Sequence, residues 1–395
     1  MKRAIALACV AAVAAGAATA ALAKPSATQS AAAAQALSCK SQLKIAMVTP
    51  LTGGAGFLGN EQLSWAKYAV KTLAPKLGLK IQLLTGDTPV EQGAAVAQSL
   101  AQKYVADSRV VGIIGPSTSG AVAASSQTYF DAGIAHISPS ATRTSLTKGE
   151  KREATPAFFR VVPGDYIQGP SDARFMIEKL KVKKVVILDF QEPYSVGLAD
   201  AVEQTLKKGD VSTSRLSVPN TVTDFSSYVT RVPSDADIVF FPTQKPADAQ
   251  TFAQQLVEQG KRAKVFGGDG SNDPDKFKFA GSYVSNFAPD ISGIAADKDI
   301  IAGWRKDNPG ATLGSFGPPT YGAVEVLLNA IKAVCVKDKG QIKDRREIIG
   351  AVKRVRIKNW ILGGSFRFST KSNDPLNAKF YIFQIQPNGS YKLVG

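Results

Sequence analysis

Segments with the pattern of strands alternate with segments with the pattern of helices along most of this chain, and this alternation constrains the fold more than any other feature. Between the first strands, apolar residues recur every three to four positions, as Leu63, Ala66 and Val70 do, which is typical of helices packed by one face. The first strand-like runs lie at 43–48, 81–84, 110–114 and 134–138. Strands alternating with helices predict a parallel sheet covered on both faces.

The same rhythm starts again after residue 158 and predicts a second sheet. Helical patterns at 197–208 and 246–260 separate its strands. Residues 158–162 are expected to be a strand-like segment that crosses to this second sheet, and the strands expected after it are 184–188, 211–217, 238–241, 265–267 and 283–287. A long helical stretch at 321–336 is followed by two short strand patterns, 364–368 and 380–384. This C-terminal part is long enough to supply the last helices and strands of both lobes. We therefore predict an α/β protein with two doubly wound parallel-sheet lobes, between which the chain crosses more than once.

One helix start has a local signal of its own. Thr88 is followed by Pro89 and, three residues after Thr88, by Glu91. This arrangement is typical of a capped first turn, so the sequence predicts a helix that begins at Thr88.

The N-terminus indicates export. Lys2 and Arg3 precede the small-apolar run 4–22, which ends in an Ala-x-Ala pattern at 21–23. This is the pattern of a secretory signal, so we expect residues 1–23 to be a signal peptide and the protein to act outside the cytoplasm, in the periplasm or at the cell surface. Residues 24–42 are rich in Ala, Ser and Gln and are expected to be a flexible lead. The roughly 370 residues that remain exceed one ordinary core, which favours two lobes.

The net charge does not by itself indicate a nucleic-acid partner. The formal charge is +16, and removal of Lys2 and Arg3 leaves 16 − 2 = +14. The basic residues lie in dispersed clusters, which are typical of solvated faces, and export argues against nucleic acid; attraction to an anionic surface stays compatible with the charge. The clusters are 179–184, 261–264, 337–346 and 353–358.

Two cysteines remain if Cys9 leaves with the signal. Cys39 and Cys335 could form one disulfide in an oxidising compartment. Two free thiols are the alternative, and the sequence leaves both open.

The glycine-rich turn Gly54-x-Gly56-x-x-Gly59 follows a strand and precedes a helix, where a dinucleotide fingerprint belongs. The acidic residue that would hold the ribose should end the second strand, and Asp87 lies several residues past that point. We interpret the glycines as a turn that lets a ligand approach the backbone, and we expect no cofactor.

The sequence contains few residues that could form a catalytic or metal-binding pattern. The segment 115–120 lacks the spacing of a nucleophile elbow, and His136, the only histidine, lies in a predicted strand, which favours a packed core residue. The alternating acids at 269–275 lack the turn glycine and the closing glutamate of a calcium loop. We therefore expect neither an enzyme nor a metal site.

Polar loops at the ends of predicted strands form a consistent set. Ser119 begins a helix, whose free first-turn amides and hydroxyl favour an anion. Ser140, Ala141 and Thr142 follow the next strand, and Asp269 lies between glycines after a strand of the second lobe. Ligands bind outside the carboxyl ends of strands in such sheets, so an anion site opposite a carboxylate predicts a zwitterionic ligand.

At these loops the chain resembles the leucine/isoleucine/valine-binding protein family, the type I periplasmic solute-binding proteins of ABC importers. The likeness extends from about residue 43 to residue 393. Its markers are Thr49-Pro50-Leu51-Thr52-Gly53, Ile114-Gly115-Pro116 with Ser119, Ile137-Ser138-Pro139-Ser140-Ala141-Thr142, Phe159-Arg160 with Asp165 and Gln168-Gly169, Tyr194 with Gly197, and Gly268-Asp269-Gly270. The resemblance implies two lobes joined by three hinge crossings: 43–160 with 290–358, and 161–289 with 359–395.

The resemblance also implies a role for individual residues. Ser119, Ser140 and Thr142 would hold the ligand's α-carboxylate, with Ala141 in the same loop. Thr142 and Asp269 would hold the α-ammonium, and Tyr194 would cover the ligand from the second lobe.

Other positions depart from the branched-chain members of the family. Leu58 and Gln244 stand where those members carry tyrosines, and Trp65 fills a position that is often glycine. Ser117 and Thr118 would line a side-chain pocket more polar than an aliphatic ligand needs. These departures put leucine-type specificity in doubt.

The resemblance implies a monomer that captures an amino acid or similar small molecule by hinge closure and delivers it to an ABC permease in the membrane. Two other classes compete. A ligand-sensing receptor module could use the same clamp, although no signalling domain is attached. An exported hydrolase would need the nucleophile–histidine pairing that the sequence lacks.

Overall fold

A computed structural model describes residues 36–395 of the protein. The expected signal peptide and residues 24–35 of the expected lead lie outside this range. The described chain forms two α/β lobes, each built on a mainly parallel sheet with helices on both faces, as the alternation predicts.

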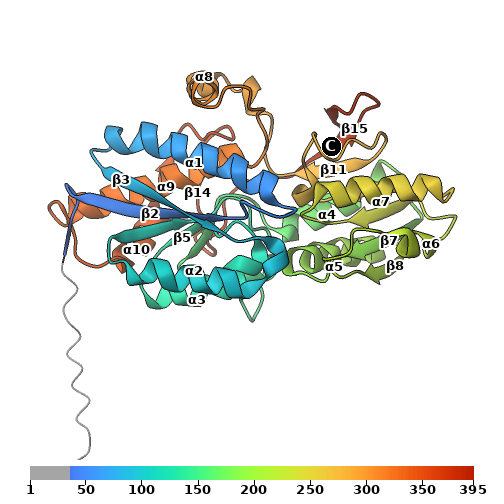
Figure 1. The fold of residues 1–395 in the computed structure, drawn as a ribbon, viewed down its shortest axis with the longest axis horizontal. Helices are drawn as coiled ribbons and strands as arrows, with labels where there is room; N and C mark the ends of the chain where they lie inside the picture. The colour runs from blue at the N-terminus through green and yellow to red at the C-terminus, as the bar shows by residue number, and fades with distance from the viewer. Residues whose placement is uncertain (1–35) are drawn as a thin grey trace, which may run out of the picture. The chain divides into compact units, whose positions relative to one another are not determined.

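The first lobe contains a five-stranded parallel sheet with the order β3-β2-β4-β5-β6. Its strands are β2 (Gln42–Thr49), β3 (Lys80–Asp87), β4 (Val110–Ile114), β5 (His136–Ser138) and β6 (Phe158–Arg160). The helices of this lobe are α1 (Gly56–Lys76), α2 (Ala94–Ala106), α3 (Ser119–Asp131), α8 (Lys298–Asp307), α9 (Gly317–Lys337) and α10 (Arg346–Arg354), seen in Figure 1.

Alternate residues of β2 build two separate cores. Ile45 and Met47 pack in one cluster with residues of α1 and α9, whereas Ala46 and Val48 pack in another with residues of α2 and α3. Successive side chains of a strand point to opposite faces, so a strand that is apolar throughout must be covered on both. The continuous apolar run that predicted this strand therefore also explains the two helical layers.

The second lobe contains a seven-stranded sheet with the order β16-β15-β11-β10-β9-β7-β8, in which β15 and β16 pair antiparallel. Its strands are β7 (Lys184–Asp189), β8 (Ser212–Ser217), β9 (Ile238–Phe241), β10 (Lys264–Gly267), β11 (Tyr283–Asn286), β15 (Tyr381–Ile385) and β16 (Tyr391–Leu393). Its helices are α4 (Asp165–Glu178), α5 (Pro193–Lys208), α6 (Ser226–Thr230) and α7 (Pro246–Glu258). Alternate residues of β7 again pack in two separate cores. Val186 packs toward α7, and Val185 packs toward α5.

Three crossings between the lobes meet in one apolar cluster. Val162 belongs to the first crossing, Phe287 to the second and Phe380 to the third, and all three pack with Leu58 and Phe316 of the first lobe. We call this set the hinge cluster. It places the covalent connections between the lobes next to one another, as a hinge requires.

The third crossing lies later than the expected boundary at 358. Trp360, Phe366 and Phe368 belong to the core of the first lobe, and β13 (Arg356–Ile357) pairs with β14 (Phe366–Arg367) there. We therefore propose that residues up to Asp374, which pairs with the first lobe's Arg160, belong to the first lobe. This return to the first lobe runs through short strands and turns, which have no periodic pattern of apolar residues. The sequence pattern therefore does not reveal it.

Trp65 anchors α8 to the first lobe. It is fully buried and stacks on Trp304 of α8, with ring centroids 4.7 Å apart and planes 15° from parallel. Such an aromatic pair contributes about 0.5–1.5 kcal/mol beyond its buried area. The indole fills space over Gly317, where an added Cβ would lie 2.0 Å from the Trp65 ring.

The helix expected to begin at Thr88 begins later. A 3-10 turn (Val90–Gln92) follows Pro89, and α2 starts at Ala94 after Gly93, whose φ is +66°. The Glu91 carboxylate accepts a hydrogen bond from the Gly54 amide instead of capping its own turn. The capping prediction is therefore wrong, because the Glu91 carboxylate binds a backbone amide that is distant in sequence and does not cap its own first turn.

The end of the expected lead is ordered. β1 (Leu37–Ser38) pairs antiparallel with β12 (Gln341–Ile342), and Cys39 forms a disulfide with Cys335 of α9. The prediction of a flexible segment is therefore wrong for residues 36–42. Among the described residues, α9 alone has the length and hydropathy of a membrane span, and 72% of the window concerned is buried inside the protein.

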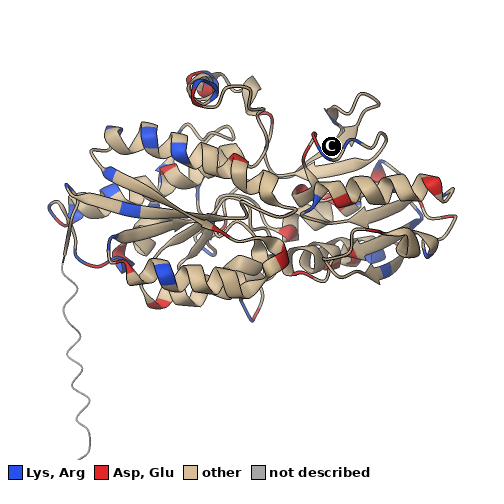
Figure 2. Cartoon of the chain, viewed as in Figure 1, with Lys and Arg blue, Asp and Glu red and all other residues tan. Residues whose placement is uncertain are grey.

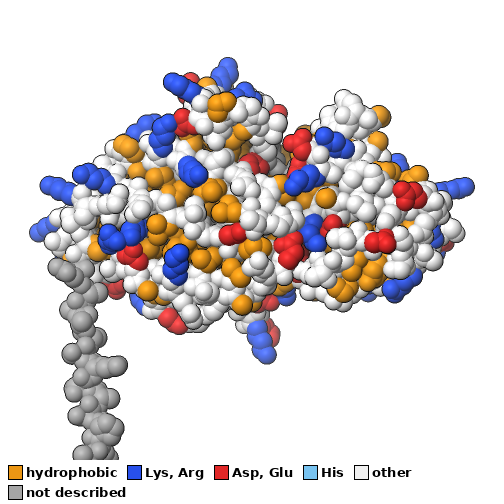
Figure 3. Space-filling view, viewed as in Figure 1, with side chains coloured by type: hydrophobic (Ala, Val, Ile, Leu, Met, Phe, Trp, Pro, Cys, Tyr) orange, Lys and Arg blue, Asp and Glu red, His pale blue; other side chains and the backbone are white. Residues whose placement is uncertain are grey.

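Charged side chains are distributed over both lobes (Figure 2). On the face shown in Figure 3, basic side chains stand at several separate places among acidic, polar and apolar ones. This agrees with the dispersed clusters in the sequence.

We predict that replacing both cysteines (Cys39→Ser with Cys335→Ser) lowers the free energy of unfolding by about 2–5 kcal/mol, because the bond closes a long loop in the unfolded chain. Urea denaturation of the exported protein and of the double variant measures this difference. Ligand affinity should not change, since the bond lies at the far end of α9 from the hinge cluster. Two titratable thiols in the unreduced folded protein would contradict the pairing.

Candidate functional site

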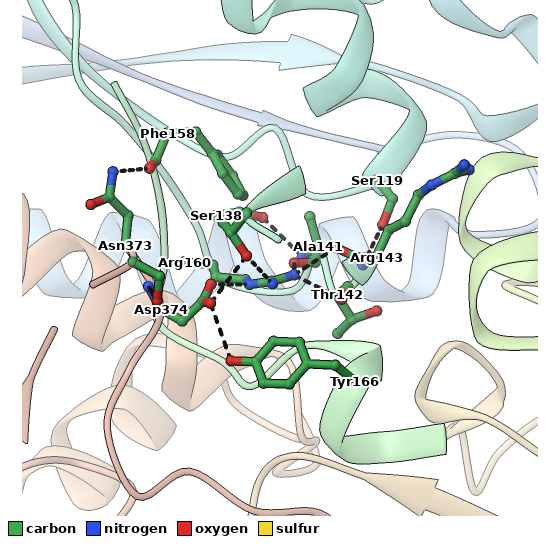
Figure 4. A network of polar contacts seen from close by, with 12 residues as sticks. Ser119, Ser138, Ala141, Thr142, Arg143, Phe158, Arg160, Tyr166, Asn373 and Asp374 are labelled. Carbon is green, nitrogen blue, oxygen red and sulfur yellow. Dashed lines mark hydrogen bonds and ion pairs between the residues drawn. The ribbon is translucent and has the colours of Figure 1, made fainter. Parts of the chain in front are cut away.

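A buried arginine positions the loop that follows β5. Arg160, at the end of β6, is fully buried. Its Nη1 donates hydrogen bonds to the carbonyl oxygens of Thr142 at 2.7 Å, Arg143 at 3.0 Å and Ala141 at 3.3 Å, as Figure 4 shows. One guanidinium nitrogen thus gathers three consecutive carbonyl groups and fixes the backbone of this loop.

Asp374 balances the charge of Arg160. The Asp374 carboxylate lies 2.7 Å from Arg160 Nε and accepts hydrogen bonds from the hydroxyls of Thr147 and Tyr166 (Figure 4). Burial alone raises the pKa of this carboxyl, but the guanidinium and the hydrogen bonds outweigh burial and hold the pKa below its ordinary value. The pair is therefore ionised at neutral pH.

The start of α3 lies where the sequence predicts an anion site, and we call it the anion cradle. Ser119 is the first residue of α3 and is 1% exposed. First-turn amides of a helix have no partner within the helix, and the partial positive charge there favours an anion. The Ser119 hydroxyl accepts a hydrogen bond from the Arg143 amide at 3.2 Å, which leaves its own hydrogen free to donate.

Ser140 and Thr142 differ in what they can offer a ligand. The Ser140 hydroxyl donates to the Ser117 carbonyl at 2.7 Å and accepts from Gln62 at 2.9 Å, so it is engaged within the lobe. The Ala141 amide donates to the Ser138 hydroxyl. By contrast, the fully buried Thr142 hydroxyl has no hydrogen-bond partner among residues 36–395. Of this loop, Thr142 offers the free side-chain group.

Asp269 begins a 3-10 turn (Asp269–Ser271) after β10 and is 2% exposed. The Tyr194 hydroxyl donates to its Oδ1 at 2.8 Å and accepts from the Gly270 amide at 3.0 Å. Gly268 permits this approach, since an added Cβ there would lie 2.5 Å from the Tyr194 hydroxyl. Burial raises the pKa of Asp269 to about 6, although the Tyr194 and Gln168 hydrogen bonds oppose the rise. Tyr194 therefore holds the carboxylate in place.

A second carboxylate at the site had no role assigned from the sequence. Asp165, the first residue of α4, is fully buried, and neither of its carboxylate oxygens has a hydrogen-bond partner among the described residues. Its amide donates to the Thr142 carbonyl at 2.8 Å. Burial, reinforced by the nearby Asp269 charge, raises its pKa to about 7, although the adjacent Thr142 hydroxyl and the Arg160 and Arg143 charges oppose the rise. It follows a crossing and not a strand end, so the strand-end rule could not find it.

A short series of contacts joins the two halves of the site. Arg143, whose amide bonds to Ser119, donates from Nη1 to the carbonyl of Pro193 in the second lobe at 2.7 Å. Pro193 adjoins Tyr194, which in turn holds Asp269. The start of α3 and the Asp269 carboxylate are thus connected through contacts between the two lobes.

A cavity of about 300 Å³ lies between the lobes beside the start of α3. Thr118 and Gly120, which flank Ser119, line it from the first lobe, and Gln244 lines it from the second. Leu58, which stands at a ligand-binding position of the family, packs in the hinge cluster. Like Ser119, Thr142 and Asp269, it is not among the residues that line this cavity.

The other sequence motifs have structural explanations. Gly59 admits a close approach of α1 to the loop after β2, because an added Cβ would lie 1.7 Å from the Pro50 carbonyl oxygen. His136 packs between Tyr129 and Phe158, and burial lowers its pKa to about 3, as a core histidine requires. Among residues 36–395, no cluster of His, Cys, Asp and Glu side chains has the arrangement of metal ligands.

Comparisons with known proteins identify the family of this chain. Residues 42–390 match the family described as "Periplasmic binding protein". The chain is 29% identical over 346 residues to the Leu/Ile/Val-binding protein BraC3 of Rhizobium johnstonii, an alignment that covers 83% of this chain and 91% of that protein.

Solved structures share the fold. A leucine-binding protein of Thermotoga maritima superposes with a TM-score of 0.78 at 21% identity, covering 89% of this chain and 98% of that one. A solute-binding protein of an R. palustris ABC transporter, in complex with benzoate, has a TM-score of 0.77 at 18% identity and covers 90% and 96%.

We predict that Arg160→Met lowers the free energy of unfolding by about 3–5 kcal/mol, because it leaves the Asp374 carboxylate buried without its cation. Lys71→Met is the control, since Lys71 is 65% exposed in its pair with Asp307 and such a pair contributes below about 1 kcal/mol. Chemical denaturation of the two variants measures both effects. Equal small losses would contradict a central role for Arg160.

Proposed function

Because the chain belongs to the periplasmic binding protein family, we propose that it captures an α-amino acid between its lobes and delivers it to an ABC importer. Its relative BraC3 is named for binding leucine, isoleucine and valine, which supports an amino acid as the ligand class.

The choice of a zwitterionic ligand rests on one observation. Buried carboxylate oxygens that lack hydrogen-bond partners among the described residues lie near the start of α3, which favours an anion. Asp165 and Asp269 are buried carboxylates, and both Asp165 oxygens lack a partner among the described residues. Buried polar groups are ordinarily hydrogen-bonded, so such a set requires a cationic donor. An α-ammonium supplies three N–H donors to Asp269, Asp165 and the Thr142 hydroxyl. The ligand's carboxylate then lies against Ser119 and the first-turn amides of α3.

A carboxylic acid without an amine fits this site less well. The benzoate-bound structure shows that the fold can hold such a ligand. In this chain, however, an aromatic acid would leave Asp165 and Asp269 buried opposite each other without a cation. Breaking the pairing of a buried charge costs about 3–5 kcal/mol, so the amino acid is favoured.

Hinge closure supplies the binding mechanism. A ligand on the first lobe alone meets Ser119 and Thr142, whereas closure adds Asp269, Asp165 and Tyr194. Only this difference in affinity drives the equilibrium toward the closed state. The Arg143–Pro193 hydrogen bond joins the lobes directly and contributes to closure in addition to the ligand.

The proposed setting follows from the family and the N-terminal pattern. Family members are binding proteins of the periplasm, and residues 1–23 have the pattern of an export signal. We propose that the protein acts as a monomer in the periplasm or at the cell surface, docks onto a membrane permease and performs no bond chemistry on its ligand.

We predict that Asp269→Asn weakens amino-acid binding by about a hundredfold or more, because the desolvated ammonium loses its counter-ion. Isothermal titration calorimetry with a panel of amino acids measures the affinity. Asp275→Asn is the matched control, since Asp275 is 75% exposed and should leave the affinity unchanged. Unchanged binding by a folded Asp269→Asn variant would remove Asp269 from the site.

We also predict that affinity falls about tenfold between pH 7 and pH 5. Burial raises the pKa of Asp269 to about 6 and that of Asp165 to about 7, and protonation removes the charges that hold the ammonium.

The stability of the unliganded protein should respond with the opposite sign. A carboxyl whose pKa is raised by folding contributes stability that is fully present below its unfolded pKa of about 4 and is lost as pH rises through 6–7. Calorimetry and thermal unfolding across pH 5–7 separate the two effects. An affinity independent of pH would contradict the proposed role of the carboxylates.

A further inference from the structure

The cavity beside the start of α3 has polar side chains set among apolar ones, and these polar groups bear on the ligand's side chain. It opens next to Ser119, because Thr118 and Gly120 line it. On the other lobe Gln244 lines it, and the Gln244 Cγ lies 3.0 Å from where a Cβ on Gly270 would stand, one residue after Asp269. A side chain that leaves an α-carbon held at the cradle therefore reaches this cavity.

Thr88 provides an unused polar group in the cavity wall. It is 3% exposed and lines the cavity, and its hydroxyl has no hydrogen-bond partner among residues 36–395. A buried hydroxyl without a partner carries a free-energy cost that a polar ligand group would remove. An aliphatic side chain would leave that cost in place.

Glu192 adds a carboxylate to the same wall. Its oxygens accept hydrogen bonds from the Ser195 amide at 3.2 Å, as the N-cap of α5, and from Gln244 Nε2 at 3.0 Å. Burial raises the pKa of Glu192 to about 7, against the hydrogen bonds from Gln244, Ser195 and Tyr194 and the Arg143 charge. Carboxylate oxygens have further lone pairs, so Glu192 can accept another donor.

The nearby cations are engaged elsewhere. Arg143 pairs with Glu153 at 3.0 Å and donates to the Pro193 carbonyl. Lys245 pairs with Asp248 at 3.1 Å and donates to the carbonyl of Asn220. Neither forms an ion pair with Glu192, which is the one ionisable side chain among the residues that line the cavity.

We propose, as a refinement that rests on the proposed function, that the preferred ligand is an amino acid whose side chain ends in N–H donors. Glu192 and Thr88 receive this end in the cavity, and Gln244 holds Glu192 in position. A carboxamide and a cationic group share this chemistry. An acidic side chain is disfavoured by the Glu192 charge, and an aliphatic one leaves the cavity's polar groups unpaired.

Competition among amino acids of similar length tests the inference. Calorimetry on the exported protein compares glutamine and lysine with methionine, leucine and glutamate. We expect glutamine or lysine to bind roughly tenfold or more tightly than methionine, because each makes hydrogen bonds that methionine cannot. Preference for glutamine identifies the amide, and preference for lysine identifies the cation. Methionine or leucine binding as tightly as both would overturn this inference alone. A complete lack of binding to all amino acids would overturn the proposed function as well.

Two variants connect the preference to the cavity. Glu192→Gln keeps the size and the N-cap acceptor and should reduce the affinity for the preferred ligand about tenfold, with methionine affinity changed less than about twofold. Thr88→Val preserves shape and should weaken the same ligand selectively. Glu258→Gln, an exposed site on α7, is the control. Loss of affinity for all ligands alike in both variants, or no loss in either, would contradict the assignment.

Discussion

The ion pair between Arg160 and Asp374 is the interaction on which the site depends most. Arg160 ends β6 immediately before the first crossing, and Asp374 comes shortly before the third. Between them they fix the carbonyls of residues 141–143, and with those the position of the Thr142 side chain. An unpaired buried charge is costly, so neither partner can move without the other. The pair therefore couples the loop that we propose contacts the ligand to two of the connections between the lobes.

The fold keeps the groups of its site buried and incompletely bonded. Elsewhere in the first lobe, polar side chains such as Ser140 and Gln62 satisfy each other. At the cleft, Thr142 and both oxygens of Asp165 have no partner among the described residues. Two apolar cores in each lobe supply the stability that offsets this cost. A site that is unfavourable when empty gains most from a ligand with matching donors, which makes binding selective as well as tight.

Sequence patterns predicted the parts of the fold that are buried on both sides. The runs 110–114 and 238–241 correspond to β4 and β9 in full, because a strand covered by helices must be apolar throughout. The pairs β1–β12 and β13–β14 are two-residue strands without such a pattern, and they escaped prediction. Among the residues of the proposed site, Ser119 and Asp269 follow strand ends and could be named from the sequence, whereas Asp165 follows a crossing and Glu192 was not singled out. Leu58 lies in the hinge cluster because neighbouring crossings, which periodicity does not reveal, meet there.

The contacts at the hinge differ in kind from the contacts at the proposed binding site. This difference determines whether the hinge or the ligand fixes the arrangement of the lobes in the closed state. The hinge cluster of Val162, Phe287, Phe380, Leu58 and Phe316 is apolar, and hydrophobic contact has little dependence on direction. Rotation about it therefore changes the energy gradually. The cleft contacts are hydrogen bonds and charges, which weaken steeply with distance and angle. The lobes can approach each other in several ways at the hinge, but few of these bring Asp269, Asp165 and Ser119 around one ligand. The ligand's own donors and acceptors thus select the closed arrangement, and the hinge permits it.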